Sequence, residues 1–91
     1  MVKIEKVVKL TAGTSAQTVA VNGLAFLMEN LSDSATVYFK EKRDDGADAA
    51  ASNGFALGPG ETLPLALTAS ELSVAASAAG TDVRLLILNE I

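Results

Sequence analysis

The chain has 91 residues, of which 49% are hydrophobic but only 4% aromatic, with eleven acidic and seven basic side chains and no histidine or cysteine. This length predicts one domain, and the absence of histidine and cysteine excludes histidine-based catalytic triads, thiol chemistry, disulfide bonds and the usual zinc sites. The net charge of −4 argues against nucleic acid as a partner, because phosphate binding needs a basic stripe.

The N-terminal residues do not predict a targeting or membrane segment. Lys3, Lys6 and Lys9 interrupt the apolar residues of this region, so we expect no signal peptide. The longest apolar runs are too short to span a bilayer. We therefore expect a soluble protein that is made and used in a cytoplasm, without a membrane partner.

The first third of the chain predicts three extended segments. Residues 1–10 form a strand or an extended N-terminal arm, with a slip near Lys6 because the apolar alternation breaks there. A second strand is expected over Gln17–Val21. The dipeptide Asn22-Gly23 follows and is a strong hairpin signal, so a third strand is expected to begin at Leu24.

The middle of the chain contains the clearest alternation. Thr36–Lys42 predicts a strand with Val37 and Phe39 on one face. Residues 43–53 carry no periodicity and predict a long, mobile loop. Phe39 is expected in the core, together with Phe26 and Phe55.

The segment Gly54–Leu67 predicts two short strands around a tight turn at Gly58-Pro59-Gly60-Glu61. Proline presets φ at the second position of a β-turn, and glycine supplies the positive φ that a type II turn requires at the third. The segment is therefore a β-hairpin or a β-corner, and we favour a corner that leads into the sheets whose final strand is Val83–Leu88.

The last third leaves one element open. Leu72–Ser77 fits a helix preceded by a Thr68/Glu71 capping box, but its alternation also fits a strand. We favour a single turn at Ala69–Glu71 followed by a strand. Val83–Leu88 predicts the final strand, and its unbroken apolar sequence is typical of a strand covered on both faces.

These elements predict an all-β fold. About eight short antiparallel strands at roughly ten-residue spacing are typical of a small single-domain β-sandwich or jelly-roll. No internal repeat or linker divides residues 1–91.

Polar clusters give little chemistry. Asp44, Asp45 and Asp48 could offer oxygen ligands to a cation, but their spacing does not match a calcium-binding loop. We interpret this segment as a solvated loop. We expect no catalytic residues, metal or cofactor, and hence no enzyme.

Surplus hydrophobicity is the remaining signal. Ala25, Leu27, Leu86 and Leu88 place apolar groups where an isolated sandwich would face water. Such patches mark protein interfaces, and a domain of this size has little material to cover itself. These four residues are the predicted interface, with burial under the N-terminal arm or the long loop as the alternative.

One stretch resembles a known layout. GFALGPGETLPLALTASELSVAASAAGTDVRLLIL, together with the earlier segments Asn30–Ser32 and Val37–Phe39, is similar to the C-terminal layout of small virion proteins of tailed bacteriophages. There an aliphatic-Pro-Gly-Glu turn leads into a strand, an alternating Ala/Ser strand and a final aliphatic strand.

The resemblance implies a structural β-sandwich or jelly-roll of the virion, assembled in the host cytoplasm, that binds itself as a dimer or trimer and binds other virion proteins such as the major capsid protein. Capsid decoration, as a cement that stabilises the head, is the favoured role. The alternatives are a neck, tail or baseplate component, or a carbohydrate- or peptide-binding module of a host-recognition appendage.

Overall fold

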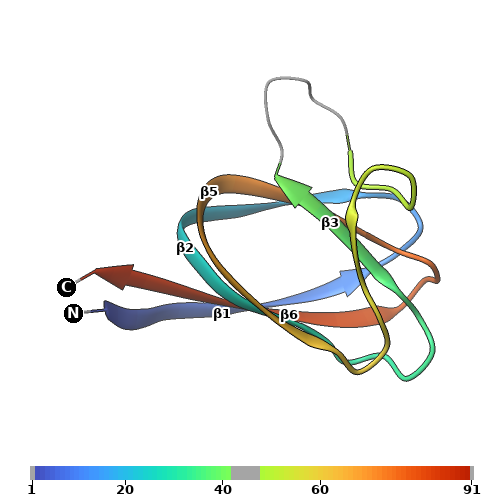
Figure 1. The fold of residues 1–91 in the computed structure, drawn as a ribbon, viewed down its shortest axis with the longest axis horizontal. Coiled ribbons are helices and arrows are strands. Elements are labelled where there is room, and N and C mark those ends of the chain that lie inside the picture. Colours follow the sequence, from blue (N-terminus) through green and yellow to red (C-terminus); the bar gives the residue numbers. More distant parts are fainter. Residues whose placement is uncertain (1, 42–47, 91) are drawn as a thin grey trace.

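The computed structural model describes residues 2–41 and 48–90, and within these ranges the side chains other than those of residues 2–6, 22–26, 65–70 and 89–90. Every regular element in these ranges is a β-strand, which confirms the all-β prediction. The strands, shown in Figure 1, are β1 (Val2–Ala12), β2 (Gln17–Asn30), β3 (Val37–Glu41), β4 (Phe55–Leu57), β5 (Thr62–Ala76) and β6 (Thr81–Glu90).

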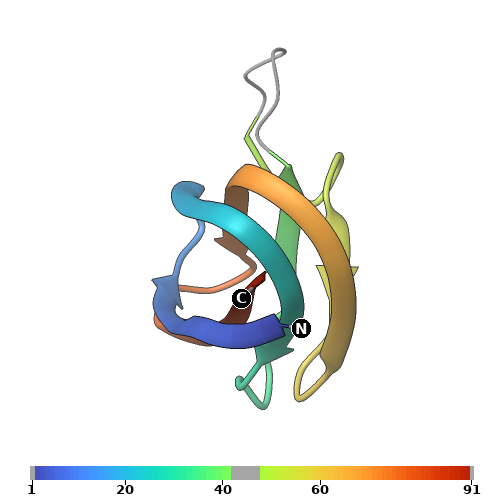
Figure 2. The same ribbon diagram turned by 90° about the vertical axis from the view of Figure 1, so that its left-hand side faces the viewer.

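The strands form one antiparallel sheet in the order β1-β6-β2-β5-β3-β4, and this sheet folds over into two layers. The two longest strands, β2 and β5, pair with each other and curve together from one layer to the other (Figure 2). Layer I contains β1, β6, residues 24–30 of β2 and residues 62–68 of β5. Layer II contains residues 17–20 of β2, residues 71–76 of β5, β3 and β4.

This arrangement is a β-sandwich with jelly-roll pairing. Since β2 and β5 each contribute one segment to each layer, the six strands supply eight segments. Counted along the chain, the first segment pairs with the eighth, the second with the seventh, the third with the sixth and the fourth with the fifth. This nested pairing of eight antiparallel segments is that of a jelly-roll, so the predicted fold class is confirmed.

Two predicted turns are wrong. The hairpin at Asn22-Gly23 and the single turn at Ala69–Glu71 both lie inside continuous strands. The β2–β5 register shifts between Ala20 and Gly23, which pair with Glu71 and Ala69. The two turn signals therefore lie opposite each other, where the paired strands bend between the layers. The strand interpretation of Leu72–Ser77 is confirmed as far as Ala76.

The β4–β5 connection is a corner. Glu61 N donates a hydrogen bond to Gly58 O at 3.1 Å, and Gly60 has a φ of 72°, which confirms the predicted type II turn. Because β4 pairs with β3 and the start of β5 pairs with β2, the two strands belong to different layers. The predicted slip in the first strand is also present, as a register shift between Ile4 and Lys6.

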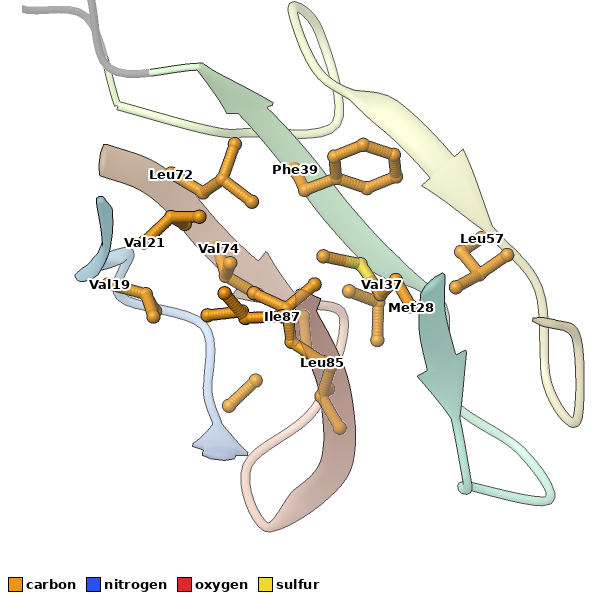
Figure 3. Close-up of a cluster of buried hydrophobic side chains, with 13 residues drawn as sticks. Val19, Val21, Met28, Val37, Phe39, Leu57, Leu72, Val74, Leu85 and Ile87 are labelled. Carbon is orange, nitrogen blue, oxygen red and sulfur yellow. The ribbon is translucent and has the colours of Figure 1, made fainter. Parts of the chain in front are cut away.

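The core lies between the two layers (Figure 3). In β6, Val83, Leu85 and Ile87 are fully buried, whereas Leu86 and Leu88 are partly exposed. This strand therefore alternates in burial despite its unbroken apolar sequence, and the expectation that both faces are covered is wrong. The other large core side chains come from both layers: Met28, Val37, Phe39, Leu57, Leu72 and Val74.

Candidate interaction surface

The outer face of layer I presents an apolar row that crosses four strands. Val7 on β1 pairs with Leu86 on β6, Leu86 with Leu27 on β2, and Leu27 with Pro64 on β5. Val7 is 52% exposed, Pro64 is exposed, and the two leucines are partly exposed. Leu88 extends the row along β6 and is also partly exposed. We call these five residues the apolar row.

A polar row runs beside the apolar row, at a distance of two residues along each strand. Lys9 pairs with Arg84, Arg84 with Glu29, and Glu29 with Thr62. Within the described residues the ion pair of Arg84 is with Asp82, from Nη2 to Oδ2 at 3.4 Å. This distance is long for a hydrogen bond, and both side chains are substantially exposed, so the pair adds little stability. Cross-strand pairing thus places opposite charges side by side on the two middle strands of this layer.

The outer face of layer II differs because the chain covers part of it. Ser73 and Ala75 lie between the core-facing residues of β5, yet they are 0% and 3% exposed. The Ser73 hydroxyl accepts a hydrogen bond from the Ala49 amide at 2.8 Å, and Ala49 is itself buried. Asn53 closes a turn in the same segment, since its amide group bonds Asp48 O and Ala50 N. Layer I has no such cover within the described residues.

Three of the four predicted interface residues are brought together. Leu27 and Leu86 are direct cross-strand neighbours, and Leu88 lies two residues along β6 on the same face. The backbone of Ala25 pairs with that of Ile87, beyond a register shift between Ala25 and Leu27, and its side chain lies outside the described set. The alternative, that the N-terminal arm covers these residues, is wrong for the described strand, because β1 lies beside β6 in the same layer.

The sequence-based prediction missed Val7 and Pro64. Val7 could have been found from the register slip, since the slip places it on the face opposite Val8 and Leu10, which pack against the core. Pro64 could have been found from a different signal in the sequence. Proline within a strand is confined largely to sheet edges, and its segment of β5 is the edge of layer I.

A second exposed apolar side chain lies on layer II. Phe55 on the edge strand β4 is 72% exposed and stacks on Phe39, with ring centroids 5.9 Å apart. The prediction that both rings belong to the core is therefore confirmed for Phe39, which is 4% exposed, and wrong for Phe55. The side chain of Phe26 lies outside the described set.

An open groove of about 480 Å³ lies at one end of the sandwich. Its walls are the 31–35 connection and the turn between β5 and β6. Leu31 is the largest apolar side chain in it, and Asp33 and Asp82 are its charged groups. Ligand pockets are usually lined by hydrophobic and aromatic side chains, and no aromatic residue lines this groove.

A buried asparagine fixes the base of the same connection. Asn30 is 1% exposed, and its Nδ2 donates to the carbonyl oxygens of Ala35, Leu57 and Gly58 at 2.8, 3.0 and 3.0 Å. Its Oδ1 accepts from Ser32 N at 3.0 Å. One amide group thus joins the end of β2 to the β4–β5 corner.

The candidate acidic loop is described only in part. Asp44 and Asp45 lie outside the described residues, and Asp48 is exposed. In the described part of the chain, no group of three or more acidic side chains lies close enough together to hold a metal ion. Within residues 2–41 and 48–90, no helix is long and apolar enough to cross a membrane.

Comparison with known proteins adds no family assignment, since no protein-family model, curated protein or solved structure matches this chain.

Proposed function

We propose that this chain is a non-enzymatic structural protein of a tailed-phage virion, which decorates the capsid and stabilises the head through protein–protein contacts. The observation that carries this proposal is the apolar row on the uncovered outer face of layer I. The resemblance of the layout of Gly54–Leu88 to small virion proteins is the reason for placing the protein in a phage particle. The folded domain measures 37 × 31 × 16 Å, so the outer faces of its layers are its broadest surfaces.

The energetics favour use of this surface by a partner. Burial of apolar area contributes about 25 cal/mol per Å², so covering about 200 Å² of the apolar row would contribute roughly 5 kcal/mol. A domain of this size has a total stability of about 5–14 kcal/mol. The surface is therefore large enough in energetic terms to determine how the protein assembles, which is the property that a cement protein requires.

The test is association with capsids. The chain should co-sediment with shells formed by the major capsid protein of the same genome, and it should raise the temperature at which filled particles release DNA. Leu86→Asp and, independently, Val7→Asp should abolish co-sedimentation. Each substitution places a carboxylate inside the apolar row, which a partner would bury. Val7 is more than half exposed, so its replacement tests the surface with little risk to the fold.

Thr18→Asp is the matched control, since it adds the same charge at an exposed position of β2 in layer II. Circular dichroism checks that each variant is folded. Failure of the wild-type chain to bind shells, or equal loss of binding in the control, would contradict the proposal.

The partner that the chain binds distinguishes the alternative positions in the particle. A neck, tail or baseplate component would sediment with tail structures and leave empty shells bare. The carbohydrate- or peptide-binding alternative would use the groove between the 31–35 connection and the β5–β6 turn, which lacks an aromatic platform. No observation in the described residues favours that alternative over assembly.

A further inference from the structure

We infer that the partner of the outer face of layer I is a second copy of this chain, packed face to face about a two-fold axis that runs parallel to the strands between β6 and β2. This inference rests on the proposed function, because it names what covers the surface on which that function depends: shells bind pairs of copies, and substitutions at Leu86 and Val7 prevent binding by preventing the pairing. Its basis is the self-complementary order of side chains across the layer.

The order of charges supports this axis. Rotation by 180° about it places each strand of layer I opposite its mirror position in the other copy: β6 faces β2, and β1 faces β5. Arg84 then lies opposite Glu29 of the second copy, and Glu29 opposite Arg84, because the two residues are direct neighbours in the polar row. Two intermolecular ion pairs form between the middle strands of the two copies, next to the apolar row.

The apolar row matches under the same operation. Leu86 lies opposite Leu27 of the second copy, and Val7 lies opposite Pro64, so apolar groups meet apolar groups at these four positions of the row. Two sheets that pack face to face keep their strand directions within about 30° of each other, which this axis permits. An isologous contact of this kind is the usual arrangement in homodimers.

The other in-plane axis fits less well. A two-fold axis perpendicular to the strands, through the apolar row, reverses the order along each strand. It would place Arg84 opposite Leu88 of the second copy, so the guanidinium would pack against an aliphatic side chain and gain no charge partner in the other copy. Desolvation of a charge without a compensating contact across the interface is costly, so the order of residues along β6 selects the axis parallel to the strands.

The size of the face limits the affinity. Four strands about 4.8 Å apart and three rows about 6.8 Å apart give about 400 Å² per copy. The resulting 800 Å² or so is below the 1,200–2,000 Å² buried in standard stable complexes. We therefore expect a dimer with a dissociation constant of about 10–100 μM in solution, which becomes fully populated when copies are held at high local concentration.

Charge reversal tests the inference. Sedimentation equilibrium of the wild-type chain, over concentrations up to about 1 mM, should fit a monomer–dimer equilibrium. Arg84→Glu alone and Glu29→Arg alone should each weaken dimerisation by at least about tenfold, because each creates two like-charge contacts in the symmetric interface. The double variant Arg84→Glu/Glu29→Arg restores opposite charges and should return the dissociation constant to within about threefold of the wild-type value.

Lys9→Glu is the matched control. It changes the net charge by the same amount as Arg84→Glu, but Lys9 lies opposite Thr62 in the proposed dimer, so its effect should stay below about threefold. Thermal unfolding followed by circular dichroism verifies the fold of each variant. Glu29→Arg leaves the Asp82–Arg84 contact in place, so the test does not depend on the variant that disrupts it.

The failure of this inference can be distinguished from the failure of the proposed function. A wild-type chain that remains monomeric at the highest concentration, forms a trimer, or is not rescued by the charge exchange overturns the two-fold dimer, whatever binds to shells. A dimer that never associates with capsids overturns the capsid role and leaves the dimer in place.

Discussion

Replacement of Asn30 by alanine tests which polar group holds the end of the sandwich together. The change removes the donor shared by the carbonyl groups of Ala35, Leu57 and Gly58 and the acceptor of the Ser32 amide. The bonds to Ala35 and Leu57 are buried, whereas the other two are partly buried and can reach water.

Each buried group left without a partner costs about 1–3 kcal/mol, which gives about 2–6 kcal/mol for the two carbonyl groups. A water molecule that enters the vacated space would satisfy part of this need, so we expect a loss of about 3 kcal/mol. For a domain of this size, 1 kcal/mol corresponds to about 4–8 °C in the melting temperature. Asn30→Ala should therefore melt about 12–24 °C below the wild-type protein.

Thermal and urea unfolding followed by far-ultraviolet circular dichroism, at one fixed protein concentration, measure this change. Asn53→Ala is the matched control, because Asn53 also bonds two backbone groups, Asp48 O and Ala50 N, but does so in an exposed turn. It should cost less than about 1 kcal/mol. Equal destabilisation by the two substitutions would refute the reasoning that burial makes the Asn30 amide important.

Further substitutions at four positions test individual features of the fold by urea unfolding. Gly60→Ala should lose about 1–2 kcal/mol through its positive φ of 72° alone, since no atom lies within 4 Å of the added Cβ; Gly60→Asn should lose less, and an equal loss would point to another cause. Ser73→Ala should lose about 1–3 kcal/mol, because the buried Ala49 amide loses its acceptor, and an unchanged midpoint would show that the loop does not depend on this bond. Phe55→Ala should lose only about 1 kcal/mol, the contribution of an exposed stacked ring, whereas Phe39→Ala should lose about 3–5 kcal/mol; similar losses would contradict their different burial.

The sequence predicted the elements whose local pattern and tertiary environment agree. β3 alternates in sequence and in burial, with Val37 and Phe39 facing the core. The turn at Gly58–Glu61 was predicted from two residues with restricted or special φ values, and Gly60 has the expected conformation. In both cases the preference of the local sequence coincides with what the fold requires, which is where local signals are most informative.

The candidate surface was predicted in part for a related reason. An apolar residue at an outward position of a strand is visible in the sequence once the strand is assigned, and Leu27, Leu86 and Leu88 were identified in this way. The row itself depends on cross-strand register, which fixes that Leu86 lies between Val7 and Leu27. Register is a property of paired strands, so the side-by-side order of Arg84 and Glu29 had no signal within either strand.

The two wrong turns have a common physical origin. Asn22-Gly23 favours conformations that extended strands avoid, and such residues serve a β-bulge as well as a hairpin. The Ala69–Glu71 segment lies directly across from it in the β2–β5 pair. Taken alone, one strand predicted a hairpin and the other a single turn. Taken together, they form a bend in a two-stranded ribbon that converts one six-stranded sheet into two layers. That bend places residues 24–30 of β2 and residues 62–68 of β5 side by side in layer I, next to β6, and so puts Leu27 and Pro64 in one row with Leu86. The local features behind the two wrong turn predictions are therefore the ones that build the surface through which we propose this protein assembles.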